Sequence, residues 1–186
     1  MILPIYLYGH SVLRKKSEDI TKEYSGFRQL ISDMFETMYK AEGVGLAAPQ
    51  IGKNINIIVI DASPMADEEN DEDELKNFKR VFVNPKITYN SDEKKCSEEG
   101  CLSIPNIHEK VDRYVDLTIE YFNENFEKLT EHLVGAKAKI IQHEYDHLNG
   151  ELFIDKISPI RRKLLNKKLS AIAKGKIATR YPIVKN

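Results

Sequence analysis

The chain has 186 residues, of which 41% are hydrophobic and 31% charged, with a formal net charge of −1. This size suits a single domain over residues 1–186, and the balanced charge excludes a general attraction to nucleic acid. No apolar run is long enough to cross a bilayer and no signal-type segment opens the chain, so we expect a cytoplasmic protein without a membrane partner.

The first forty residues are expected to be mainly helical. Ser11 before Val12 and Leu13 predicts a short capped helical turn. Apolar residues at helical spacing predict an amphipathic helix over 26–40, with Ser25 as its cap. The stripe consists of Phe27, Leu30, Ile31, Met34, Phe35 and Met38. We interpret it as core, including its methionines.

Residues 43–52 (GVGLAAPQIG) form a run of small residues with two early glycines. Such backbone turns sharply or lets another chain approach closely. The phosphate-loop pattern fails because Gln50 stands where a glycine is required and Asn54 follows Lys53. A substrate-facing loop and a tight turn before a strand both remain open. The Gln50 amide can donate to a developing oxyanion.

Most of the middle of the chain is predicted to be β-structure. Residues 55–61 predict a buried strand, and residues 81–83 open another, with Pro85 marking an edge or a bulge. The acidic run at 67–74 lacks the glycine of a calcium loop and predicts a solvated insertion.

Residues 111–121 alternate between apolar and polar and predict one half-buried strand. Arg113 interrupts its apolar face, so we expect it to pair with a carboxylate, Asp146 being the candidate. Residues 123–125 predict a hairpin turn into a strand that ends at Gly135, and residues 151–157 predict a last short strand.

The C-terminal part predicts a basic helix over 158–176, beginning at Ser158-Pro159. Its apolar stripe is Ile160, Leu164, Leu165, Leu169 and Ile172. Its other face carries Arg161, Arg162, Lys163, Lys167, Lys168, Lys174 and Lys176. A solvated face and a surface for an anionic partner such as RNA or a membrane both remain open.

Residues 142–147 (QHEYDH) contain the H-E-x-x-H pattern, in a helix expected from about 136 to 148. On a helix, His143 and His147 point the same way and can share one divalent cation. Glu144 is then placed to take a proton from a water on that cation. The plainer alternative is an amphipathic helix with two surface histidines, so a third ligand is needed to make a site.

Cys101 is our candidate for the third ligand. It follows Gly100 in a predicted loop, residues 98–105, that ends in a proline. Alone it would be a buried apolar thiol, but one cysteine with two histidines is a ligand set that leaves a coordination position open. Cys96 is expected to be an uninvolved surface thiol, and no disulfide is expected.

These residues predict hydrolysis at a carbonyl. The metal would lower the pKa of a water, and Glu144 would take the proton and pass it to the leaving amine. The Gln50 amide and the backbone N–H of Leu102 would stabilise the oxyanion.

Three segments, 43–50 (GVGLAAPQ), 99–103 (EGCLS) and 142–147 (QHEYDH), resemble the motifs of peptide deformylase, in that family's order. The resemblance implies removal of the formyl group from the formyl-methionine of nascent chains, with release of formate. It implies one divalent metal ion per chain, usually ferrous iron, although the ligands also suit zinc, nickel and cobalt.

The same resemblance implies an α+β fold in which antiparallel sheets surround a central metal-binding helix, with an N-terminal amphipathic helix and a C-terminal helix. The substrate is then expected to lie as an added strand, with Val44, Gly45 and Gly100 at substrate-contacting positions. Ser97 and Lys139 fall where some members carry larger apolar residues. In bacterial members the terminal helix docks on the ribosome, which favours a partner for residues 160–176.

Three alternatives differ in their chemistry. A metallopeptidase would share the His-Glu helix but usually takes a histidine or glutamate as its third ligand. A thiol hydrolase would use Cys101 as nucleophile with a histidine base. A non-enzymatic module would have a structural metal, which requires a fourth protein ligand, and only Cys96 offers one.

Overall fold

The computed structural model describes residues 1–66 and 75–184, so the acidic run at 67–74 lies outside the described residues. Its α-helices are α1 (Phe27–Lys40), α3 (Gly135–Leu148) and α4 (Pro159–Ala173), and its 3₁₀ helices are η1 (Ser11–Arg14), η2 (Ala48–Ile51), η3 (Ser63–Met65) and η4 (Phe153–Asp155). The strands are β1 (Ile5–Tyr6), β2 (Gly45–Ala47), β3 (Ile57–Asp61), β4 (Lys79–Asn90), β5 (Lys94–Cys101), β6 (Ile104–Tyr114), β7 (Asp116–Phe122), β8 (Lys128–Val134) and β9 (Ile183–Val184). Within the described ranges, every helix is too short or too polar to span a membrane.

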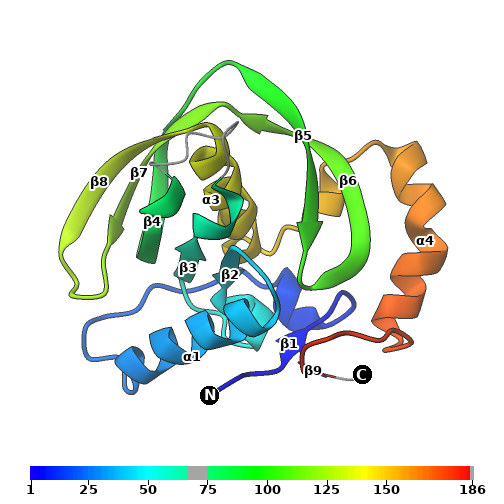
Figure 1. Cartoon of the computed structure of the whole chain (residues 1–186), viewed down its shortest axis with the longest axis horizontal. Coiled ribbons are helices and arrows are strands. Elements are labelled where there is room, and N and C mark those ends of the chain that lie inside the picture. The colour runs from blue at the N-terminus through cyan, green and yellow to red at the C-terminus, as the bar shows by residue number, and fades with distance from the viewer. Residues whose placement is uncertain (67–74, 185–186) are drawn as a thin grey trace.

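The strands form three sheets around helix α3. One is a five-stranded antiparallel sheet in the order β2-β3-β4-β7-β8, one is the antiparallel hairpin β5–β6, and the third is the parallel pair β1–β9. In Figure 1, α3 lies between the five-stranded sheet and the hairpin, with α1 below the sheet and α4 beside the hairpin. The α+β architecture expected from the sequence is confirmed.

Helix α3 is held by apolar packing on one side and by an amide clamp on another. Ala138, Ile141 and Leu148 are buried in a cluster shared with the five-stranded sheet. Gln142 donates to the carbonyl of Tyr114 at 2.9 Å and accepts from the Tyr114 N–H at 3.0 Å. The clamp ties the middle of α3 to the end of β6, so the next residue, His143, has a fixed position.

Helix α1 confirms the predicted amphipathic helix, and its apolar stripe is buried in the second core cluster. The predicted Ser25 cap is wrong. The N-cap is Gly26 in the left-handed conformation (φ 74°), without a side-chain cap, because a glycine adopts that turn without steric strain.

Three strand predictions need correction. Residues 98–105 are not a loop: they form the end of a tight β-hairpin whose turn is Leu102-Ser103. Residues 111–121 belong to two strands, because the chain leaves β6 at Val115 to enter the other sheet. Residues 151–157 are not a strand: Phe153–Asp155 form the 3₁₀ helix η4, because the Leu152 N–H is capped by Asp155 at 2.9 Å. The bulge expected near Pro85 is confirmed by a register shift between Val83 and Lys86.

Helix α4 begins as predicted, with the Ser158 hydroxyl accepting from the Arg161 N–H. Its apolar stripe is only partly buried. Leu165, Leu169 and Ile172 enter the core, whereas Ile160 and Leu164 are 75% and 68% exposed.

Candidate active site

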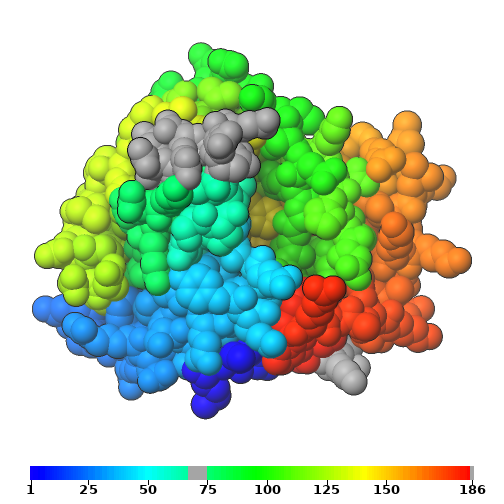
Figure 2. All heavy atoms as spheres, viewed as in Figure 1, coloured from blue at the N-terminus to red at the C-terminus, as the bar shows by residue number. Residues whose placement is uncertain are grey.

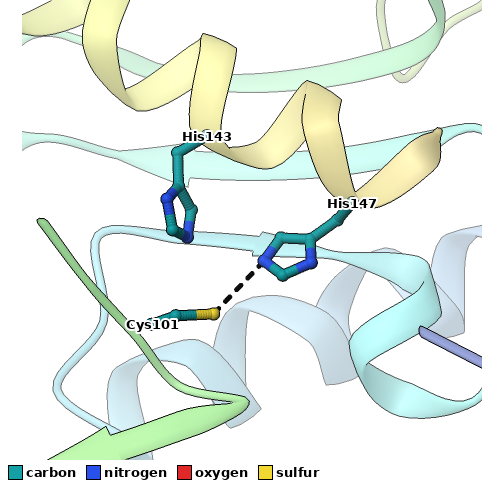
Figure 3. Close-up of side chains that lie close together, drawn as sticks. All are labelled: Cys101, His143 and His147. Carbon is teal, nitrogen blue, oxygen red and sulfur yellow. Dashed lines mark hydrogen bonds between the residues drawn. The ribbon is translucent and has the colours of Figure 1, made fainter. Parts of the chain in front are cut away.

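Cys101, His143 and His147 converge at one point, although 42 residues separate the cysteine from the first histidine. Their donor atoms all lie within 4.8 Å of one another, and the Cys101 sulfur is 3.3 Å from His147 Nε2. Figure 3 shows both imidazoles descending from consecutive turns of α3 toward the sulfur at the end of β5. One face of a helix and one strand end thus build the cluster.

A buried carboxylate orients His143. Its Nδ1 lies 2.9 Å from Glu99 Oε2, which leaves Nε2 directed at the cluster. Burial alone would raise the pKa of Glu99, but hydrogen bonds and charges from Arg113 and His143 lower it to about 2. Glu99 is therefore an ionised carboxylate that accepts a hydrogen bond from His143 Nδ1–H. Metal-binding histidines commonly donate their second ring N–H to a carboxylate in this way.

Arg113 bridges the two elements that carry the cluster. It donates to both oxygens of Glu99, at 2.7 and 2.9 Å, and to Asp146 Oδ2 at 2.6 Å, and it is 3% exposed. The contact with Asp146 was expected from the sequence and is confirmed. The bond to Glu99 was not expected, although an acidic side chain two residues before Cys101 was the available signal.

The donor set fits a divalent metal ion. Burial lowers the pKa of His147 well below its usual value, which keeps the ring in the neutral form that binds metals. Among the described residues, His147 Nδ1 and Glu144 Oε2 are buried polar atoms without a hydrogen-bond partner. One thiolate and two imidazoles suit zinc, iron, cobalt and nickel, and they leave a coordination position for a water or a substrate.

Glu144 lines the cleft next to His143 and is almost fully buried. Its side chain is 5% exposed, and burial raises its pKa from 4.5 to about 7. The Glu144 carboxylate can occupy this position only because residue 45 is a glycine: a Cβ at Gly45 would lie 2.5 Å from Glu144 Oε1. The backbone of β2 therefore runs directly along the carboxylate. The glycine-rich segment is a short edge strand followed by η2, rather than the loop or the tight turn before a strand that the sequence left open.

The side-chain amide of Gln50 is oriented by the backbone. Its Oε1 accepts from the Ala47 N–H at 2.8 Å, so its NH₂ group must face the cluster. There it lies 3.7 Å from the Cys101 sulfur and 3.3 Å from the Ser103 hydroxyl. Leu102 follows Cys101 in the hairpin turn. The amide of Gln50 thus lies beside the candidate metal position, and Leu102 lines the same cleft.

A cleft of about 670 Å³ gives access to the cluster. His143 and Glu144 line it from α3, together with Val44, Gly45, Gln50, Gly100, Cys101 and Leu102. Figure 2 shows it as a hollow between the cyan atoms that include β2 and the green atoms of β5–β6. Among the described strands, β2 pairs only with β3 and β5 only with β6, so each can present a free edge to a peptide.

The predicted metal ligands, catalytic residues and substrate-contacting residues all line this cleft, except His147, which is buried. Ser97 and Lys139 also line the cleft. Cys96 is exposed and is not part of the cluster. The sequence missed Glu99, the clamp made by Gln142, and Tyr181, which reaches the cleft from the C-terminal segment.

Comparison with known proteins places these observations in a family. Residues 2–163 match the family model described as polypeptide deformylase. The chain is 50% identical over 185 residues to the peptide deformylase of Christiangramia forsetii, covering 97% of this chain and 94% of the relative. It is 44% identical to the peptide deformylase of Pseudothermotoga lettingae, covering 97% and 98%.

The fold gives the same relationship. A crystal structure of a peptide deformylase from Legionella pneumophila superimposes with a TM-score of 0.80 at 35% identity, covering 95% of this chain and 98% of that one. Crystals of peptide deformylase from Plasmodium falciparum give a TM-score of 0.81 at 37% identity, covering 92% and 95%.

Proposed function

Since this chain belongs to the peptide deformylase family, we propose that Cys101, His143 and His147 are the metal ligands of its deformylation reaction and that Glu144 is the general acid–base. The protein is a metal-dependent hydrolase that removes the formyl group from the N-terminal formyl-methionine of nascent polypeptides and releases formate. The observation that carries the proposal is the convergence of three donor atoms beside a buried carboxylate in an open cleft.

Cys101, His143 and His147 would hold the metal ion, which would act as a Lewis acid by lowering the pKa of a water and polarising the formyl carbonyl. Glu144 accepts the proton of the attacking water and delivers it to the leaving amine, and a pKa raised to about 7 by burial suits both transfers. Gln50 and the Leu102 backbone N–H donate to the oxygen of the formyl group as negative charge develops on it.

The substrate is proposed to lie as an extended strand between β2 and β5. Val44 and Gly45 would contact it from one side and Gly100 from the other, and all three line the cleft. Backbone contacts of this kind recognise the main chain of the substrate peptide rather than its side chains. They suit an enzyme that must accept many nascent sequences after a common first residue.

The identity of the metal, the compartment and the domain limits also belong to the proposal. We assign ferrous iron and a cytoplasmic location from the family resemblance, and one catalytic domain over residues 1–186. Metal analysis of protein purified without oxygen tests the first, because a ferrous site or its thiolate ligand is lost on oxidation. Iron at one equivalent per chain is expected.

The ribosome is the proposed partner of α4. Lys163, Lys167 and Lys168 are exposed on this helix, beside the exposed Ile160 and Leu164. Arg161 and Arg162 are instead engaged with Glu109 and Asp155. A face that is both basic and apolar is better explained by contact with a ribonucleoprotein surface than by exposure to solvent alone.

The direct test is a formate assay with formyl-methionyl-alanyl-serine, run with and without chelator. Formate release that chelation abolishes is expected, and an N-acetyl peptide should not react. Glu144→Gln should bind the same amount of metal and lose about 10²–10⁴-fold in kcat. Cleavage of an internal peptide bond without formate would identify a metallopeptidase. Activity that survives chelation but not alkylation would identify a thiol hydrolase.

A further inference from the structure

The turn Leu102-Ser103 is held by three contacts from distant parts of the chain. The Gln50 amide donates to the Ser103 hydroxyl at 3.3 Å, and the Tyr8 N–H donates to the Ser103 carbonyl at 2.8 Å. The third contact is the Tyr181 hydroxyl, which donates to the Leu102 carbonyl at 2.7 Å. These contacts restrain a turn that would otherwise be free to move at the tip of a hairpin.

Tyr181 comes from the segment that follows α4. Gly175, with φ 64°, reverses the chain at the end of the helix. The segment then runs to β9, which pairs in parallel with β1 through Ile5↔Ile183. Figure 2 shows its atoms (red) between the blue N-terminal atoms and the green hairpin.

This segment is anchored independently of the turn. The Ile5 N–H donates to the Pro182 carbonyl at 2.9 Å, and His10 Nε2 lies 3.2 Å from the Val184 carbonyl. Ile177, Tyr181 and Ile183 pack against the buried core cluster. The tyrosine hydroxyl is therefore presented from a fixed support, and its ring forms part of the cleft wall.

We propose that Tyr181 is a positioning residue for deformylation: by holding the Leu102 carbonyl, it fixes the hairpin turn and so aims the Leu102 N–H at the reacting formyl oxygen. The proposal rests on the role of the Leu102 N–H in the proposed function. The Leu102 carbonyl and the Leu102 N–H lie in adjacent peptide planes that are joined at the Leu102 Cα. A bond that fixes the plane of the carbonyl therefore leaves only the two backbone rotations of Leu102 to change the direction of its N–H.

The chemistry of the contact suits this role. Burial raises the pKa of the Tyr181 hydroxyl, and the charge of Cys101 raises it further, so the hydroxyl stays protonated and remains a donor. The side chain offers a rigid ring with few rotatable bonds. The Tyr181 hydroxyl keeps donating its hydrogen bond to the Leu102 carbonyl throughout the reaction and exchanges no proton with the substrate.

The test compares Tyr181→Phe with Tyr121→Phe in metal-loaded protein. Both changes remove one hydroxyl and keep the ring, and Tyr121 loses a 3.0 Å bond to Glu131 in the five-stranded sheet, away from the cleft. Tyr181→Phe should lower kcat by about 3- to 10-fold and leave KM within about twofold, because the donor is loosened rather than removed. Tyr121→Phe should leave both constants unchanged.

A second measurement needs no turnover. In zinc-loaded protein, the NMR order parameter of the Leu102 N–H should fall from about 0.85 toward about 0.6 in Tyr181→Phe and stay unchanged in Tyr121→Phe. The proposal is overturned if kcat is unchanged, if only KM rises, or if both variants lose activity equally. Wild-type protein that released no formate would contradict the proposed function instead, which separates the two failures.

Discussion

The side chain of Glu144 packs directly against the backbone of Gly45 in the cleft. The carboxylate lies where a Cβ at Gly45 would approach it to 2.5 Å. The requirement at Gly45 is therefore one of space, since its φ is not in the left-handed region. Because the pKa of Glu144 depends on its burial, any shift of the side chain changes both its position and its proton affinity.

Gly45→Ala should lower kcat by about 10²-fold, because Glu144 must leave its position or β2 must move, and misplacing a catalytic group by about 1 Å has effects of this size. The control is Gly43→Ala, whose Cβ would meet only the end of the Leu102 side chain, at 2.8 Å, a group that can rotate away. Steady-state kinetics on both variants would contradict this account if they retained equal activity.

At this scale the sequence was most informative where a pattern has few chemical meanings. His143, Glu144 and His147 follow from four-residue spacing on a helix, and Cys101 follows from the need for a third ligand. Glu99 and Tyr181 could not be assigned a role in this way. A carboxylate that orients a histidine and a hydroxyl that holds a carbonyl depend on contacts across 44 and 79 residues.

At the scale of elements, Arg113 joins the hairpin to helix α3. It pairs with Glu99 and Asp146, two largely buried carboxylates whose other partners are His143 and Lys156. The alternation of residues 111–121 revealed the inward position of this arginine. It did not reveal that the segment is two strands in two sheets, because the same alternation continues across the break at Val115.

Arg113→Leu should destabilise the fold by about 3–5 kcal/mol, because in a largely buried setting it leaves Glu99 with only His143 and Asp146 with only Lys156 as a partner. It should also weaken metal affinity by about 10- to 100-fold through the loss of His143 orientation. Arg113→Lys should recover part of the stability but not the two-pronged contact with Glu99. Denaturant unfolding and metal titration measure the two effects, and unchanged metal affinity in Arg113→Leu would sink this account.

Asp155 joins three elements in the way that Arg113 joins two: its carboxylate connects the N-terminal segment, η4 and α4. It accepts from Arg14 at 2.5 and 3.1 Å, from Arg162 at 2.6 Å and from the Leu152 N–H at 2.9 Å. Burial raises the pKa of Asp155, but the hydrogen bonds from Arg14, Leu152 and Arg162 outweigh that effect and lower it below 3.8.

Since the folded-state pKa is depressed, the contribution of Asp155 to stability is complete above about pH 4 and is lost as pH falls through the folded-state value. Asp155→Asn should therefore reduce the free energy of unfolding by about 1–3 kcal/mol at pH 7. The difference from wild type should shrink below about pH 4. Denaturant unfolding at several pH values measures it. A difference that is constant between pH 7 and pH 3, or equal to that of the exposed Asp19→Asn, would refute the linkage.

At the scale of the whole molecule, segments near both ends of the chain close around the turn Leu102-Ser103. The Tyr8 N–H donates to the Ser103 carbonyl, the Tyr181 hydroxyl donates to the Leu102 carbonyl, and β1 pairs with β9. Helical and strand periodicity predicted α1, α3 and α4, but periodicity carries no information about this closure. Strands of two residues have too little pattern to be recognised, and their pairing depends on the finished fold.

The outward face of α4 gives a prediction at the same scale. Exchanging Lys163, Lys167 and Lys168 together for Glu should weaken sedimentation with ribosomes by about 10-fold or more at moderate salt and leave kcat on a short peptide unchanged. The control exchanges the exposed Lys15, Lys16 and Lys22, which lie in the N-terminal segment. Equal loss in both triple variants would indicate charge alone, and no loss in either would remove the ribosome as the partner of this face.

X-ray absorption on the metal of the protein purified without oxygen tests the metal site most directly. One sulfur at about 2.3 Å, two imidazole nitrogens at about 2.0–2.1 Å and at least one light oxygen ligand are expected for a metal bound to Cys101, His143 and His147. A spectrum without sulfur, or with a fourth protein ligand in place of the oxygen, would contradict an open hydrolytic site.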